Sequence, residues 1–417
     1  MLGSGESSHE AVYNRCALPQ ELIDQIVDAL SSSKHSLRVC TLVAHAWLPS
    51  SRRYLFASVQ LSEDKFVEFL AFARTCAFGP QYIRELTFNG HQPQQVMSNR
   101  TAISPAYLHS LLAYLPQLES LLLFMACLRD ESSNAQSLQV PPSNLEGSTG
   151  QTSALKSLTI YYSGTQNDRF TDLAHVISVF PYIGRLYMRS QRFRSNYSPD
   201  DVPRELADTS PDVIVRLPPV QALVVDDNDF RTNLYLAVAV QSVAWCDNLR
   251  AIEIQSRQAW DHKMLGTLLR VTGTRLEYLS LQLSKLFEPE NVEAFVEELS
   301  LSSCIALASL ALQLHPNPFL LRPLSWATLC TLVGSIPRTT LVRHILLQIG
   351  VRSSHVNDML HPWNGMDNIL AGFDSLESVA FPAEHFAAYT EQGKELVRGA
   401  FPRVSRKARI EFPLSAQ

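Results

Sequence analysis

The sequence predicts an α/β protein in which a small three-helix module precedes a curved solenoid, with a parallel sheet inside and helices outside. Three observations carry this prediction. A short apolar pattern recurs along most of the chain, segments with helical periodicity separate its copies, and residues 14–60 lack helix–strand alternation of this kind. Strands and helices that alternate at a period of about 30 residues form parallel sheets covered by helices. A unit repeated at such a period buries its apolar face by stacking on its neighbours.

The recurring pattern is apolar-x-x-apolar-x-apolar. Because successive side chains of a strand alternate between its faces, the fourth and sixth positions lie on one face of a short strand. A single doubly wound open sheet is the alternative, but the recurrence of one short motif favours the solenoid. The copies are IRELTF from residue 83, LESLLL from 118, LKSLTI from 155, IGRLYM from 183, VQALVV from 220, LRAIEI from 249, LEYLSL from 276, LASLAL from 307, VRHILL from 342 and LESVAF from 376.

Segments with the apolar spacing of amphipathic helices separate the strands. One begins with Ser104-Pro105, a capping residue followed by proline in the first turn. Two stretches rich in Ser, Asn, Gly and Pro, about 129–152 and 191–211, are expected to be flexible surface insertions. The solenoid is therefore expected to cover 61–412. The predicted helices cover 64–77, 104–115, 168–180, 233–245, 260–271, 291–301, 324–336 and 385–401.

The motif resembles the leucine-rich repeat, whose signature is L-x-x-L-x-L-x-x-N/C-x-L. The copies match the first six positions of that signature. Its Asn/Cys position is filled by Asn228 alone, in the copy that starts at residue 220. The resemblance is therefore to irregular, long leucine-rich repeats, and it implies a solenoid without a continuous ladder of buried asparagines.

Residues 14–60 predict a separate helical module. Its first helical segment, 19–30, places Leu22, Ile23, Ile26 and Val27 at helical spacing. A unit of this size is too small to bury all its apolar side chains. Its surplus apolar surface predicts a docking face for a partner. Packing against the first repeat helix is the alternative.

The module resembles the F-box family, especially the F-box-like proteins of mushroom-forming fungi. The resemblance is carried by Leu18-Pro19-x-Glu21-Leu22, Ile26-Val27, Leu30, Leu37-Arg38-x-Cys40-x-Leu42-Val43, Ala46-Trp47 and Arg53-Tyr54-Leu55-Phe56. It implies docking onto the small adaptor subunit of a cullin–RING ubiquitin ligase, while the following domain recruits the substrate. Trp47 is expected to close the core of the module. The adaptor-facing residues that the resemblance implies are Leu18, Pro19, Leu22, Ile26, Leu30, Leu37 and Val43.

The inner face of the predicted sheet supplies the candidate substrate-binding residues. Four glutamines each follow one copy of the motif, and alternation places them on the face opposite the core. Stacked strands would align their amides either into a ladder or into a polar stripe that binds a peptide, and the two readings are compatible. Tyrosine and arginine on the same face favour recognition. The candidates are Tyr161, Arg185, Tyr187, Arg189, Gln255, Tyr278, Gln282, Gln313, His344 and Gln348.

No sequence motif identifies a catalytic, cofactor-binding or metal-binding site. Asp226-Asp227-Asn228-Asp229 lacks the glycine and the downstream glutamate of an EF-hand, so an acidic loop is favoured over a Ca²⁺ or Mg²⁺ site. The sequence holds no phosphate-binding glycine loop, HExxH or CxxC pair. The basic residues Arg398, Arg403, Arg406, Lys407 and Arg409 surround a last edge strand, and nucleic-acid contact is the weaker reading.

Composition limits the classes of partner and compartment. The chain of 417 residues has a net charge of -5 and seven cysteines. No attraction to nucleic acid or to anionic membranes follows from that charge. Scattered single cysteines and the lack of a secretory signal predict an intracellular protein of the cytoplasm or nucleus. The expected function is a non-catalytic substrate receptor of a ubiquitin ligase, without cofactor or metal. The alternative is a repeat scaffold with a degenerate F-box and no ligase role.

Overall fold

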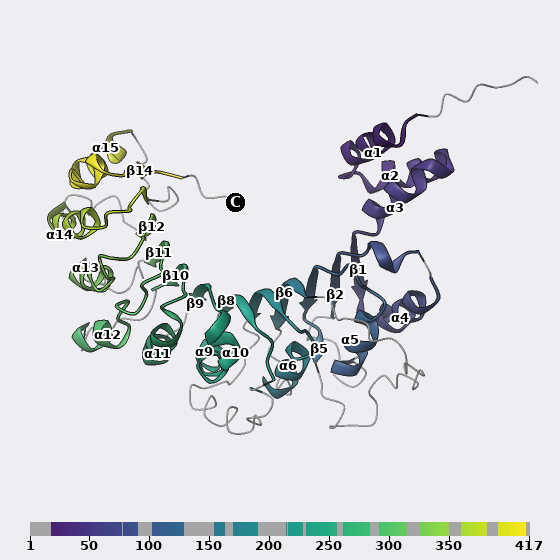
Figure 1. Ribbon diagram of the computed structural model, residues 1–417, viewed down its shortest axis with the longest axis horizontal. Helices are drawn as coiled ribbons and strands as arrows, with labels where there is room; N and C mark the ends of the chain where they lie inside the picture. The colour runs from purple at the N-terminus through teal and green to yellow at the C-terminus, as the bar shows by residue number, and fades with distance from the viewer. Residues whose placement is uncertain are drawn as a thin grey trace, which may run out of the picture.

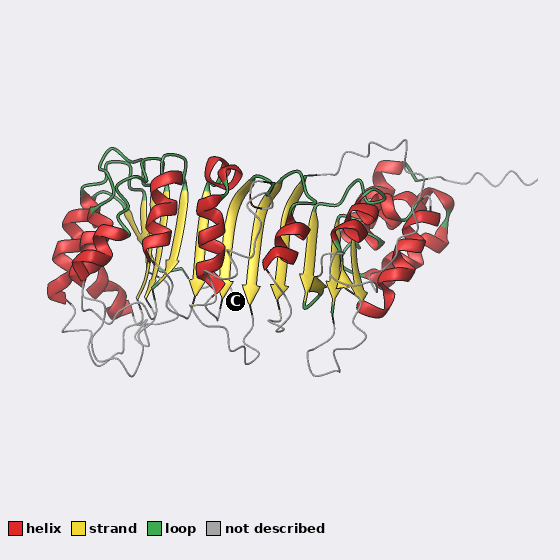
Figure 2. Ribbon diagram, turned by 90° about the horizontal axis from the view of Figure 1, so that it is seen from below, coloured by secondary structure: helices red, strands yellow, loops and turns green. Residues whose placement is uncertain are grey.

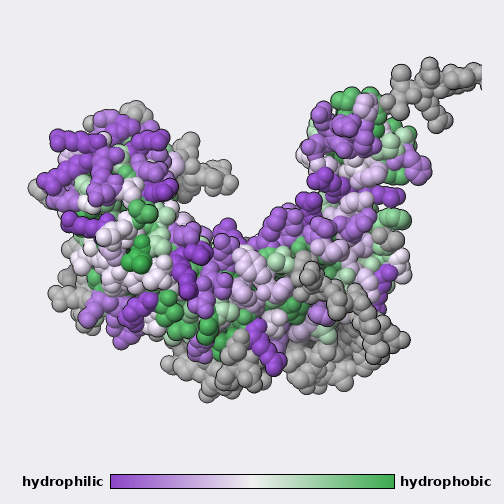
Figure 3. Space-filling view, in the orientation of Figure 1, coloured by the Kyte–Doolittle hydropathy of each residue, from purple (hydrophilic) through white to green (hydrophobic). Residues whose placement is uncertain are grey.

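The computed structural model is a horseshoe built on one curved parallel sheet (Figure 1). It describes residues 18–76, 78–90, 102–128, 154–162, 170–190, 214, 216–227, 231–256, 262–283, 292–314, 326–349, 360–381 and 391–413. The expected insertions at 129–152 and 191–211 lie outside these residues. The space-filling view shows the hollow between the two arms of the horseshoe, bordered mainly by polar side chains (Figure 3).

Within the described residues the main sheet has 12 strands in chain order, each pairing with its neighbour in parallel. All ten copies of the motif form strands, so the predicted α/β fold with a parallel sheet is confirmed. A two-stranded sheet, β3 (Ala102–Ile103) with β5 (Cys127–Leu128), lies beside it. The main strands are β1 (Ser58–Ser62), β2 (Glu85–Asn89), β4 (Ser120–Phe124), β6 (Leu155–Tyr162), β7 (Ile183–Ser190), β8 (Val220–Asp227), β9 (Ala251–Ser256), β10 (Tyr278–Gln282), β11 (Ser309–Leu314), β12 (His344–Ile349), β13 (Ser378–Ala380) and β14 (Arg409–Glu411).

Helices cover the outer, convex side of the sheet, and the strands all run in one direction behind them (Figure 2). The apolar core lies between the two layers and extends without interruption from the first repeat to the last. Apolar strand positions point into this core, as the alternation of side chains requires. The outer helices are α4 (Phe66–Thr75), α5 (Pro105–Leu112), α6 (Phe170–Ile177), α9 (Arg231–Gln241), α10 (Val243–Asn248), α11 (His262–Thr272), α12 (Val292–Glu298), α13 (Trp326–Gly334), α14 (Leu360–Ala371) and α15 (Glu391–Ala400).

The first strand of the sheet begins inside the segment that the sequence assigned to the module. Residues 56–61 read FASVQL, which is a further copy of the motif. Strand β1 pairs with β2, with Val59 opposite Leu86 and Leu61 opposite Phe88. Ser58 to Gln60 therefore belong to the sheet rather than to the module.

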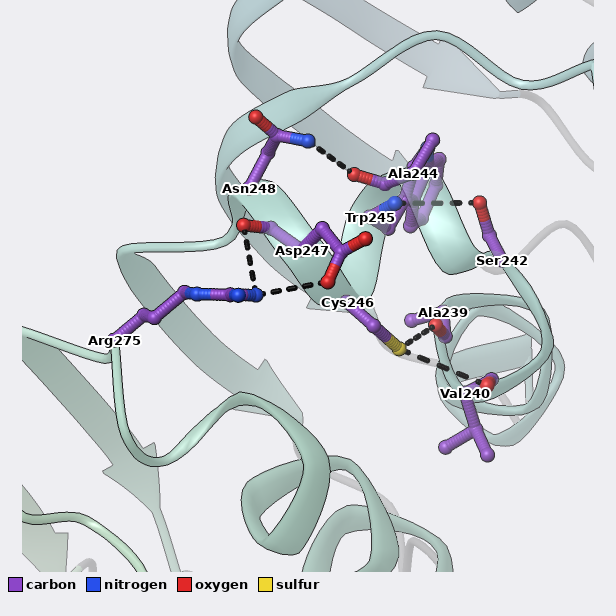
Figure 4. A network of polar contacts seen from close by, with 9 residues as sticks. All are labelled: Ala239, Val240, Ser242, Ala244, Trp245, Cys246, Asp247, Asn248 and Arg275. Carbon is purple, nitrogen blue, oxygen red and sulfur yellow. Dashed lines mark hydrogen bonds and ion pairs between the residues drawn. The ribbon is translucent and has the colours of Figure 1, made fainter.

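One predicted helix is broken in two. The segment 233–245 was expected to be continuous, but α9 ends at Gln241 and α10 begins at Val243. Ser242 lies between them and caps α10, its hydroxyl accepting from the backbone N–H of Trp245 at 3.4 Å (Figure 4). At the end of α10, Asp247 pairs with Arg275 of the next repeat at 2.8 Å. The break therefore turns α10 toward the following repeat.

The N-terminal module has a small core of its own. It consists of α1 (Gln20–Ala29), α2 (Lys34–Val43), a short 3₁₀ turn (His45–Trp47) and α3 (Leu48–Leu55). Ile23, Val27 and Leu37 form a cluster separate from the solenoid core. Trp47 packs against this cluster, in agreement with its predicted role in the core of the module.

Candidate functional site

Two surfaces were expected to bind partners, and the first lies on the module. Leu18, Leu22 and Ile26 keep 47%, 43% and 39% of their surface exposed, although they are large apolar residues. Pro19 is exposed beside them. On α2 the exposed apolar side chains are Val39, Leu42 and Val43. We call these seven residues the module face. Isolated exposed apolar residues are ordinary, but seven on α1, α2 and the two residues before α1 are a feature of interaction sites.

The predicted adaptor-facing residues divide by burial. Leu18, Pro19, Leu22, Ile26 and Val43 lie on the module face. Leu30 is half-buried and packs against the core of the module. Leu37 is fully buried, so its predicted place on a partner-facing surface is wrong. It lies on the side of α2 that closes against Ile23 and Val27.

Sequence reasoning missed two residues of the module face, Val39 and Leu42. Leu42 is 85% exposed, the largest value among the exposed apolar residues of the described chain. Val39 lies three residues before Leu42 and four residues before Val43, a spacing that places the three on the same side of α2. The phase of Leu37 and Cys40, which are buried, would have assigned them to the outer side of the helix.

The first repeat helix does not take up the apolar residues of the module. Its own apolar residues Phe66, Phe69, Leu70 and Ala73 are buried in the solenoid core. The module projects from the N-terminal end of the sheet, with α1 at the tip of the arm (Figure 1). The module face is therefore left uncovered within the described part of the chain.

A polar contact fixes α1 against α3. The Asp24 carboxylate accepts from the Gln20 amide at 2.9 Å and from the Ser50 hydroxyl, and the Gln20 amide also contacts Ser50 Oγ at 3.3 Å. The hydrogen bond from Ser50 is the main cause that lowers the pKa of Asp24. This exposed contact joins α1 to α3 and adds to the buried packing of Ile23 and Val27 that holds α1 in the module.

The second surface is the inner face of the sheet, where strand register aligns side chains in rows. The predicted residues that follow the motif fall into one such row, and the part of this row from β4 to β12 crosses eight strands of the main sheet. We call it the upper row, because it lies toward the carboxyl ends of the strands. Its members, in order, are Phe124, Tyr161, Arg189, Asp226, Gln255, Gln282, Gln313 and Gln348.

On β6 to β8 the upper row forms a cluster of aromatic and charged groups. Arg189 lies over the Tyr161 ring at 5.0 Å, donates to its hydroxyl, and pairs with Asp226 at 3.2 Å. The Tyr187 hydroxyl donates to the same oxygen that Arg189 contacts, Asp226 Oδ2, at 2.7 Å. Burial, then the bond to Asp226, raises the pKa of Tyr187. The ring of Phe124 adds a contact to Tyr161 at 5.2 Å.

Asp226 is therefore engaged by Tyr187 and Arg189, which explains its position without a metal. Asn228 and Asp229, the rest of the acidic motif, lie outside the described residues. Across the described ranges no group of three His, Cys, Asp or Glu side chains is placed to hold a metal ion.

The lower rows of the inner face contain a second paired charge. Arg185 lies 3.4 Å from Glu253, and Gln255 donates to the same carboxylate. Tyr278 is near this pair, and burial is the main cause that raises its pKa. Farther along, His344 Nδ1 lies 3.1 Å from the hydroxyl of Ser378. The structure thus brings the predicted residues of β6 to β9 into contact and places Tyr278 of β10 near them, but it leaves the glutamines of β10 to β12 in a separate group.

That group consists of Gln282, Gln313 and Gln348. Gln282 is opposite Gln313, and Gln313 is opposite Gln348, as the predicted row requires. The strand register aligns these amides as the predicted ladder requires. Within the described residues, however, no hydrogen bond joins one amide to the next.

The architecture and the repeat pattern together define an α/β solenoid of the leucine-rich-repeat-like class. No protein-family model matches the chain, and no curated protein matches its sequence. Among solved structures, the leucine-rich repeat-containing protein LegL7 from Legionella pneumophila is similar, with 14% sequence identity and a TM-score of 0.43. The match covers 85% of this chain and 89% of LegL7. No helix in the described ranges has the length and apolar character to cross a membrane.

Proposed function

We propose that this chain is a non-catalytic substrate-recognition subunit of a cullin–RING ubiquitin ligase of the SCF type. The module face would dock onto the adaptor subunit, and through it onto a cullin, while the inner face of the solenoid would bind a protein substrate. The proposal rests on the resemblance of residues 18–56 to an F-box. The observation that carries it is the exposed module face on a unit with its own core.

Physical chemistry supports a partner at this face. Burying apolar surface contributes about 25 cal/mol per Å². A partner that covers the exposed leucine and isoleucine side chains would therefore gain binding free energy from their burial. The competing explanation required the first repeat helix to cover them, and α4 instead buries its apolar side in the solenoid. The separation of the two cores also allows the module to present its face without disturbing the solenoid.

A second candidate function is a protein-interaction scaffold whose F-box is degenerate and has no ligase role. The observation that favours this candidate is Leu37, which the F-box resemblance assigns to the adaptor and which is fully buried. In that case the module would serve as an N-terminal extension of the solenoid, and the inner face alone would bind partners.

The test is capture of the purified ligase adaptor by the full chain and by Leu22→Asp with Ile26→Asp. We expect this pair of substitutions to abolish capture, because each places a carboxylate in a surface that must become dry. Both side chains are already about 40% exposed, so the fold should survive. Leu341→Asp is the matched control, since Leu341 is an exposed leucine near β12 at the other end of the solenoid.

Two outcomes would contradict the receptor proposal. Capture that persists in the double variant would remove the module face from the interaction. Failure of the unmodified chain to capture the adaptor would leave the scaffold as the better reading. A deletion used beside these variants should end at residue 55, because Phe56 packs against the solenoid core and the Ala57 carbonyl accepts from the backbone N–H of Glu85 in β2.

A further inference from the structure

The polar side chains of the inner face differ in their hydrogen bonding along the sheet. On β6 to β9 they bond to one another, whereas Gln282, Gln313 and Gln348 on β10 to β12 do not. We infer that these three glutamines form a binding site for an uncharged polypeptide segment in extended conformation. The inference deepens the proposed function and rests on it in one respect, that the segment belongs to the recruited substrate.

Spacing supports a polypeptide backbone as the ligand. Neighbouring strands lie about 4.8 Å apart, so the amides of Gln282 and Gln348 are separated by about 10 Å along the row. An extended chain advances about 3.3 Å per residue, so three residues cover that distance. Each glutamine amide both donates and accepts, which matches the alternating N–H and C=O groups of a backbone.

The amide of Gln282 is available to a ligand. The residue is 8% exposed, and its position in the strand directs it to the inner face. Its amide is not one of the buried polar groups of the described chain that lack a hydrogen-bond partner, so it still reaches solvent. A bound backbone would replace that water with a donor or acceptor of its own.

Charge argues for an uncharged segment. Two acid–base pairs account for the side chains of Asp, Glu, Lys and Arg on the inner face between β4 and β13 in the described chain: Arg189 with Asp226, and Arg185 with Glu253. Among the side chains that the structure describes on this face of the strands, no further charge remains to neutralise an acidic or a basic ligand. Burying an unpaired charge is expensive, so a charged segment would be rejected beside the glutamines.

The row beside the glutamines is built mostly of small side chains, of which Ser280 and Ala311 are themselves buried. Directly beside the glutamines, the next row of the inner face holds Ser280, Ala311, Leu346 and Ala380, which are in register. Three of these four side chains are small. In the same row nearer the N-terminus the corresponding residues include Tyr187 and Glu253, which fill the face.

The experiment titrates the full-length protein against fluorescein-labelled peptides of matched length, followed by fluorescence anisotropy. One peptide contains Ser, Thr, Asn and Gly, a second contains Glu at regular intervals, and a third contains Lys at the same intervals. Peptides of about twelve residues are long enough to cross the three strands. We expect the uncharged peptide to bind at least about tenfold more tightly than either charged peptide.

Two variants locate the site. Replacing all three glutamines by alanine should weaken binding of the uncharged peptide by about tenfold or more, because several hydrogen bonds are lost. Gln313→Glu keeps the size of the side chain and should weaken the same peptide without altering the thermal melt. Thr159→Ala on β6 is the control on the same face, and its affinity should stay within about twofold of the unmodified chain.

Equal or tighter binding of a charged peptide would overturn the inference, as would unchanged binding after the triple substitution or no binding of any peptide. Adaptor capture by the same protein tests the proposed function separately. Capture without peptide binding would reject this site and keep the receptor, and peptide binding without capture would keep this site and favour the scaffold.

Discussion

The two ends of the chain differ in whether their apolar residues are buried. At the C-terminal end, Trp363, Phe381 and Phe401 pack together with ring centroids 5.3 to 6.1 Å apart, and all three are buried. At the N-terminal end, the module keeps a separate small core and leaves Leu22 and Leu42 exposed. A repeat array needs polar caps at both ends to remain soluble. An end that retains an apolar face is therefore a candidate for partner binding rather than a cap.

Charged groups complete the C-terminal cap. Lys407 donates to Asp374 at 3.2 Å and to the backbone carbonyl of Ala371, and Arg398 lies over the Phe412 ring at 5.4 Å. Strand β14 is the last strand of the sheet and carries Arg409 and Glu411, both exposed. This arrangement agrees with the interpretation of the basic residues as protection of an edge strand.

The largest effect is expected from Phe401→Ala. The side chain is fully buried and contacts both Trp363 and Phe381, so its removal leaves a large cavity. Truncating a buried phenylalanine costs about 3–5 kcal/mol. Thermal unfolding followed by circular dichroism should show a clear loss in melting temperature, and adaptor capture should persist. Leu341→Ala, at an exposed leucine, should change little; a loss equal to that of Phe401→Ala would show that the aromatic cluster has no special role.

Most of the fold was predictable because the apolar positions of the motif determine which face of each strand is buried. Apolar residues at the fourth and sixth positions define a buried strand face wherever they occur, as in Leu121 and Leu123 of β4. The prediction failed where a local feature masked the pattern. Strand β1 overlaps the resemblance that defined the module, and α14 contains Pro362 and Gly365, which lower helical propensity. Pro362 is tolerated because it lies in the first turn.

The sequence predicted which side chains lie on the inner face, but not which of them pair with one another. Alternation places Arg189 and Asp226 on the inner face, yet their pairing depends on the register between strands that are 37 residues apart in sequence. The same limit applies to the module. Leu37 and Val43 belong to one apolar pattern on α2, and the phase of the helix against Ile23 decides which is buried.

Leu37→Ala tests whether the N-terminal module unfolds independently of the solenoid. Leu37 is fully buried in a core separate from the solenoid, so its loss should act on the module alone. Replacing a buried leucine by alanine costs about 2–5 kcal/mol, a large share of what so small a core contributes. Hydrogen exchange should show faster exchange in α1 and α2 and unchanged protection in β6 to β9. Equal loss of protection in both regions would show that the module and solenoid unfold as one unit.

Asp367→Ala has the smallest expected effect and tests how the C-terminal cap is attached. The carboxylate is 3% exposed, and its oxygens accept from the backbone N–H groups of Val404 at 2.9 Å and Arg403 at 3.2 Å. It thereby joins α14 to the 3₁₀ turn Val404–Arg406 that leads into β14. Leaving these buried donors without a partner costs about 1–3 kcal/mol. Because solenoid stability is passed between neighbouring repeats, hydrogen exchange should accelerate in β14 and α15 before β12. Asp374→Ala removes a fully exposed carboxylate whose pair with Lys407 lies at the surface, so it should change this protection much less. Unaltered exchange in Asp367→Ala would show that the aromatic cluster alone holds the cap in place.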